Sequence, residues 1–168
     1  MRFPPLPVVA AMFLAVPATA DVLVEFDEGA PKDRFTVTGL AECATGPAEI
    51  TIDLSGSAAG LIFDVTGSGA GVQVFQPFEA SASGDALLGA TEVRDGDTEV
   101  TLRLRDIAMG TSVSFTIDVD DTTGGREITV SGSEIAGASV RVSNGQGDFE
   151  AAFSEAGTAR VPVDGCMS

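Results

Sequence analysis

Alternation of apolar and polar residues runs through most of this chain and limits what it can fold into. The clearest run is residues 113–120 (VSFTIDVD), in which Val, Phe, Ile and Val alternate with Ser, Thr, Asp and Asp. Successive side chains of a β-strand point to opposite faces, so such a run predicts a strand with one buried and one polar side. Similar runs occur at residues 22–27, 35–38, 50–54, 61–65, 72–76, 100–105, 128–130, 140–142 and 161–163.

Turn-forming residues bound these runs and give them the spacing of an all-β domain. Gly, Ser, Asp and Pro separate the segments, as at residues 55–57, 67–71, 95–97 and 144–147, and stretches of helical period are missing. The pattern predicts an all-β fold, a single-domain β-sandwich or jelly roll of about ten short strands over residues 21–168. Residues 79–92 are less patterned and predict a loop with a short strand at Leu87-Leu88.

The first twenty residues have the features of a cleavable signal peptide. Arg2 is followed by the apolar run 8–16 (VVAAMFLAV) and by Ala18-Thr19-Ala20, which predicts cleavage before Asp21. The run is too short to span a bilayer. We therefore expect an exported protein, periplasmic or extracellular, with no membrane insertion after cleavage.

Two cysteines, Cys43 and Cys166, lie in the part expected to fold. An even number of cysteines in an exported protein predicts a disulfide, here one that ties the carboxyl terminus to an early strand. The alternative, a catalytic thiol, needs a neighbouring base such as histidine, and the chain has none.

The charge balance narrows the range of partners. The chain has 25 acidic and nine basic residues and a formal net charge of −16, so phosphate backbones and anionic lipids would repel it and nucleic-acid binding is not expected. An acidic surface suits divalent cations or basic partners. It equally suits a protein that only needs to stay soluble in salt.

Two acidic segments are the candidate metal site. Asp118 and Asp120 share one face of a predicted strand and Asp121 enters the following turn, while Asp95 and Asp97 flank a glycine in another turn. If the two turns meet, these five aspartates could share a calcium ion, which takes six to eight oxygens in irregular geometry. The alternative is a solvated acidic edge neutralised by Arg94 and Arg126; Asp53 and Asp64 are interpreted as surface residues.

The residue inventory argues against an enzyme. Without histidine, neither a Ser-His-Asp triad nor a histidine zinc site can form. A pair of carboxylates acting on a glycan stays open in principle, but the chain has no Trp or Tyr for a sugar platform. The eight phenylalanines beyond the leader fall mostly at inward strand positions and are expected in the core.

Several segments resemble one family when taken together. They are residues 26–35 (FDEGAPKDRF), 60–65 (GLIFDV), 74–79 (VFQPFE) and 115–122 (FTIDVDDT). They resemble short exported proteobacterial proteins labelled aggregation factor core protein, after the sponge cell-adhesion proteoglycan, and the stretch 117–121 is loosely similar to the ends of Calx-β repeats. The resemblance implies a calcium-linked adhesion module with the acidic residues as ligands, although this chain has no tandem repeats.

The leading hypothesis is therefore an exported acidic sandwich that binds calcium and acts in adhesion or the extracellular matrix, with another surface protein or a glycan as partner. The alternative is a metal-free structural or envelope domain, and the third hypothesis is a carboxylate-based enzyme acting on glycans.

Overall fold

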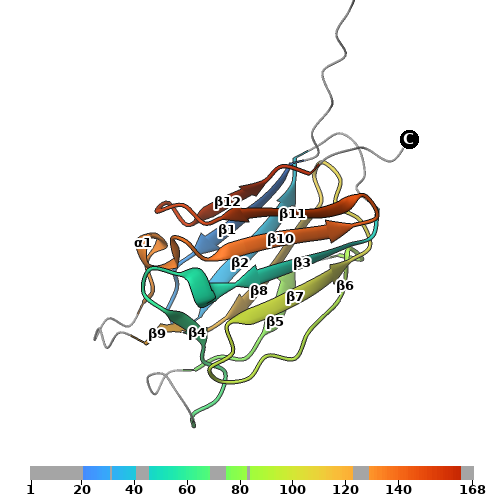
Figure 1. Ribbon diagram of the computed structural model, residues 1–168. Coiled ribbons are helices and arrows are strands. Elements are labelled where there is room, and N and C mark those ends of the chain that lie inside the picture. The colour runs from blue at the N-terminus through green and yellow to red at the C-terminus, as the bar shows by residue number, and fades with distance from the viewer. Residues whose placement is uncertain are drawn as a thin grey trace, which may run out of the picture.

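Most of the alternating runs form antiparallel strands that pack as two main sheets (Figure 1). The described parts of two predicted runs, residues 75–76 and 129–130, are not in strands. The computed structural model describes residues 21–30, 32–40, 46–68, 75–82, 84–122 and 129–163. The predicted leader, both cysteines and Arg126 lie outside the described residues. The prediction of an all-β sandwich is confirmed, with twelve described strands in place of about ten.

The first sheet has five strands in the order β12-β1-β2-β8-β5. Their bounds are Thr158–Val161 for β12, Val22–Asp27 for β1, Asp33–Gly39 for β2, Ser112–Ile117 for β8 and Glu79–Ala82 for β5. The second sheet also has five strands, in the order β11-β10-β3-β7-β6. Their bounds are Gly147–Ala152 for β11, Ser139–Asn144 for β10, Ala48–Asp53 for β3, Glu99–Leu104 for β7 and Leu87–Ala90 for β6.

A third, two-stranded sheet lies at one end of the sandwich. It pairs β4 (Leu61–Phe63) with β9 (Val119–Asp121), and we call it the ribbon. The 3₁₀-helix η1 (Leu54–Gly56) leads from β3 toward β4, and the short helix α1 (Gly132–Ile135) precedes β10. Helix α1 was not expected from the sequence. Its start is fixed by a capping box between Ser131 and Glu134.

The core lies between the two main sheets and contains a group of aromatic rings around Phe35. The Phe35 ring lies 5.1 Å from the rings of both Phe26 and Phe115, and Phe153 meets it edge-on at 6.4 Å. Phe35 and Phe115 are fully buried, and each such side chain contributes roughly 1.5–3 kcal/mol through removal from water. The expectation that most phenylalanines are core residues is confirmed, with Phe75 the exception at 39% exposure.

Short connections join the sheets along both sides. Residues 84–86 lie between β5 and β6, and residues 153–157 link β11 to β12. The outer strands β5 and β6 both have an irregular register with their neighbours, a feature that discourages pairing with other chains. Because these links run along the sides of the sandwich, the turns between strands lie at its two ends, and a functional site is expected at one of these ends.

Candidate functional site

The candidate residues gather where one strand of the first sheet changes partners. β8 pairs with β2 as far as Ile117 and with β5 as far as Thr116, and the same segment then continues as β9, which pairs with β4. Between the two, the Asp118 N–H donates to the Gln76 carbonyl and the Asp118 carbonyl accepts from the Asp64 N–H, both at 3.1 Å. This change of partner sets the ribbon beside the start of β2, at the lower left of Figure 1. We call this part of the molecule the acidic end.

Asp33, at the start of β2, fixes the position of the chain where β8 continues into β9. Its side chain is only 1% exposed; Oδ2 accepts the Val119 N–H at 3.0 Å and Oδ1 accepts the Gly29 N–H at 3.1 Å. Burial raises the pKa of Asp33 to about 7, although both backbone hydrogen bonds act to lower it. Sequence analysis missed Asp33, although its position two residues before Phe35 places it on the buried side of the strand.

Two aspartates face each other across the ribbon. Phe63 is paired with Val119, and extending the antiparallel register by one residue places Asp64 opposite Asp118. Asp120 lies two residues along β9 from Asp118 and therefore on the same face. Like charges directly opposite each other destabilise a strand pair. When these carboxylates are ionised, their repulsion therefore opposes pairing of β4 with β9.

Asp64 is buried, which corrects the interpretation of it as a surface residue. Its side chain is 1% exposed, and its Oδ1 is inaccessible and has no hydrogen-bond partner among the described residues. The alternation of residues 61–65 predicted one solvent-facing side, but all three residues of β4 are buried because the ribbon is covered on both faces. Asp53, the other residue assigned to the surface, is half-buried and its side chain accepts the Ser55 N–H at the start of η1.

Burial and mutual repulsion change the acidity of these carboxyls. Burial raises the pKa of Asp64 to about 6, and the charges of Asp95 and Asp120 add to the effect. Burial, followed by the charges of Asp33, Asp64 and Asp120, raises the pKa of Asp118 to about 7. A cation among these groups would relieve the repulsion that now favours their protonated forms.

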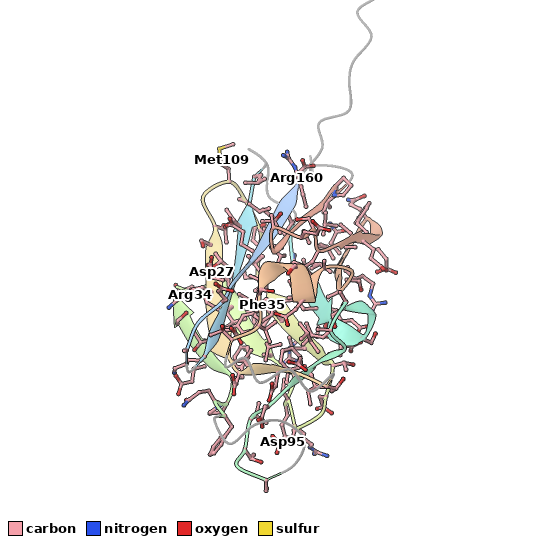
Figure 2. All side chains as sticks on the ribbon, turned by 90° about the vertical axis from the view of Figure 1, so that its left-hand side faces the viewer. Asp27, Arg34, Phe35, Asp95, Met109 and Arg160 are labelled. Atoms are coloured by element: carbon pink, nitrogen blue, oxygen red, sulfur yellow. The ribbon has the colours of Figure 1, made fainter. Side chains whose placement is uncertain are left out.

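The second acidic turn docks against the other edge of β4. Asp95 Oδ1 accepts the N–H groups of Val65 and Thr66, both at 2.8 Å, and Oδ2 accepts the Thr66 hydroxyl. The Thr66 hydroxyl and these backbone bonds lower the pKa of Asp95. Figure 2 shows Asp95 at the pole of the molecule opposite Met109 and Arg160.

The five aspartates predicted as ligands thus come to one end of the molecule but have different surroundings. Asp95 and Asp120 are close enough to act on the charge of Asp64, and Asp118 lies opposite Asp64. Asp97 Oδ2 instead accepts the Arg94 N–H at 2.8 Å within its own turn, and the Asp121 N–H donates to Asp120 Oδ1 at 2.9 Å. As placed, no three acidic, histidine or cysteine side chains of the described segments are arranged to hold a metal ion.

Three basic side chains among the described residues form ion pairs with carboxylates outside the group Asp33, Asp64 and Asp118. Lys32 pairs with Glu79, Arg94 with Glu92, and Arg160 with Asp21. None of these pairs involves Asp33, Asp64 or Asp118. Arg94, which the alternative interpretation used to neutralise a solvated acidic edge, lies 3.7 Å from Glu92 within the described part of the chain, and its side chain is largely exposed.

A shallow hollow of about 380 Å³ lies at the other end of the second sheet. Its apolar lining comes from Pro47, Leu88 and Leu104, and its charged groups are Glu49 and Arg103. One acid and one base provide no set of ligands comparable with the acidic end. The acidic end is therefore the candidate site.

The sequence matches no protein-family model, and no curated protein matches it at a significant level. No helix among the described residues has the length and apolar character needed to cross a membrane.

Proposed function

We propose that the acidic end binds calcium, and that the protein is an exported sandwich module acting in adhesion or in the extracellular matrix. The observation that carries the proposal is the Asp64 carboxyl, which is buried, lies opposite Asp118 and has one oxygen without a hydrogen-bond partner in the part of the chain that the structure describes. A buried polar group without a partner is costly, and a buried charge more so. A cation held between Asp64, Asp118 and Asp120 would offset that cost.

Calcium fits these ligands better than other common ions. The donors are carboxylate oxygens on two segments, the residue after β4 and residues 118–120. Calcium accepts many oxygens in flexible geometry, whereas magnesium requires a near-ideal octahedron. Zinc prefers nitrogen and sulfur ligands, and the chain has no histidine. In the proposed role the ion draws the carboxylates together and stiffens the end of the module that meets its partner, another surface protein or a glycan.

A melting curve with and without calcium tests the binding. At a calcium concentration about 100 times the dissociation constant, the native state gains about 2.7 kcal/mol, so the melting midpoint rises by several degrees over that in chelator. Magnesium at the same concentration is expected to have a smaller effect. Identical midpoints in calcium and in chelator would remove the proposal.

Asp64→Asn and Asp148→Asn are the matched pair of variants. Both remove one negative charge, but Asp148 is exposed on β11 at the opposite end of the second sheet. Asp64→Asn should weaken calcium binding at least about tenfold by calorimetry, or about 1.4 kcal/mol, and Asp148→Asn should leave it unchanged. Equal weakening in both variants would indicate a diffuse effect of net charge in place of a site.

The adhesive role needs its own measurement. Beads coated with the protein should cluster in calcium, or bind cells, and lose this property in chelator and with Asp64→Asn. Calcium binding without any clustering or cell binding would reject the adhesive role and leave a calcium-stabilised structural domain.

A further inference from the structure

The ribbon is the least supported strand pair of the described structure. Each of its strands has three residues, against six for β1 and seven for β2, and it belongs to neither main sheet. Short elements with few hydrogen bonds open locally at lower cost than the centre of a sheet.

The residues that carry the facing carboxylates also hold the ribbon through their backbones. The Asp64 N–H donates to the Asp118 carbonyl at 3.1 Å, Asp118 donates to Gln76 at 3.1 Å, and Gln76 donates back to Asp64 at 3.3 Å. At the far end, the Thr122 hydroxyl donates to the Gly60 carbonyl at 2.8 Å. Because the three backbone bonds form a closed ring, Asp64 and Asp118 cannot separate without breaking it.

The side chains on the two faces of the ribbon have opposite effects on whether its strands stay paired. Leu61, Phe63 and Val119 are buried and favour the closed ribbon. Asp64, Asp118 and Asp120 repel one another on the other face and favour separation of the strands. The balance between closed and open forms therefore depends on what neutralises the carboxylates.

We infer that cation binding and closure of the ribbon are one coupled event, so that the ion orders residues 60–66 and 118–122 as it binds. This inference rests on the proposed calcium site and adds the conformational consequence of filling it. Asp33 sets the limit of the opening, because its buried carboxylate holds the Val119 N–H against β2. The main sheets are expected to stay intact while the ribbon opens.

Hydrogen exchange read by mass spectrometry tests the coupling in the full chain. Peptides covering residues 60–66 and 118–122 should exchange about tenfold more slowly, or slower still, in calcium than in chelator. Peptides from β3 and β10, in the middle of the second sheet, should show no change. Binding seen by calorimetry with unchanged exchange in the ribbon would overturn the coupling and leave the calcium site standing; absence of binding would overturn both.

A variant separates charge repulsion from the ion itself. Asp118→Asn removes one of the two facing charges and keeps the shape of the side chain, so the ribbon should be protected in chelator about as well as the unmodified protein is in calcium. Asp148→Asn should leave ribbon exchange unchanged. If Asp118→Asn left the ribbon exchanging as fast as the unmodified protein in chelator, repulsion would not control closure and the inference would fall.

Discussion

The aromatic core and the acidic end begin on the same strand, two residues apart. Phe35 and Asp33 both point inward from β2 and are almost fully buried. Phe35 gains from its surroundings, because its ring packs on three others, whereas Asp33 is held by two backbone N–H groups while burial disfavours its charge. The difference shows that burial alone does not indicate a contribution to stability. Burial of Phe35 stabilises the fold, whereas burial of Asp33 is tolerated only because two backbone N–H groups donate to its carboxyl group.

Truncation of the core should have the largest effect. Phe35→Ala removes the central ring of the aromatic group and is expected to lower the free energy of unfolding by about 3–5 kcal/mol, measured by urea denaturation. Thr38→Ala, on the outward side of the same strand, should change it by less than about 0.5 kcal/mol. A loss below about 1 kcal/mol for Phe35→Ala would contradict the central place given to this ring.

Loss of the predicted disulfide should have the next largest effect on the free energy of unfolding. The strands that lead toward the two cysteines end at the opposite end of the first sheet from the acidic end. Leu40 and Val163, the last described residues before each cysteine, follow strands that are both paired with β1 at Val22. A bond between Cys43 and Cys166 would close a long loop, so Cys166→Ser should cost about 2–4 kcal/mol. Thiol titration of the unfolded, unreduced protein should find no free thiol; two free thiols would contradict the prediction.

At the acidic end, loss of the Asp33 carboxylate should cost less than loss of the ring. Asp33→Ala leaves the N–H groups of Gly29 and Val119 without their acceptor, and we expect a loss of about 1–3 kcal/mol at pH 6. Asp33→Asn, which keeps one acceptor oxygen, should fall between this variant and the unmodified protein. Asp27→Ala, at the exposed end of β1, is the control; an equal loss there would show that charge, and not the two hydrogen bonds, is responsible.

In chelator, the stability of the protein should also depend on pH. The pKa values of Asp33, Asp64 and Asp118 are about 7, 6 and 7, above the ordinary value of 3.8. The native state therefore binds more protons than the unfolded state between about pH 4 and 7, and stability falls as pH rises through that window. The melting midpoint should decrease from pH 5 to 7.5, less steeply in Asp64→Asn and in calcium. A midpoint that rises over this range in chelator would contradict the assignment.

Much of the fold could be predicted from the sequence because period-two alternation directly reports which side of a strand is buried. The run at residues 113–117 became β8 with the expected inward residues, and the expected short strand at Leu87-Leu88 is part of β6. At the end of this run, residues 117–121, the predicted orientation of Asp120 toward solvent was wrong, because Asp120 is buried. The pattern contains no information about the strand changing partners after Ile117.

The candidate site could be predicted only in part, because alternation along the chain does not show which segments pair with one another. Acidic turns at residues 95–97 and 118–121 are visible in the sequence, and the structure places both at one end. Asp64 was assigned to the surface because an aspartate between apolar neighbours in a strand usually faces water. Its burial follows from β4 lying between β9 and the turn at residues 94–97, an arrangement of three segments far apart in the chain.

The sequence by itself determined the strands, their inward faces and the excess of negative charge, because these depend on residue type and on spacing along the chain. Only the tertiary structure decided which carboxylates face each other and which lie out of reach of solvent. That depends on long-range pairing: Asp64 meets Asp118 and Asp33 meets Val119 only once the chain has folded.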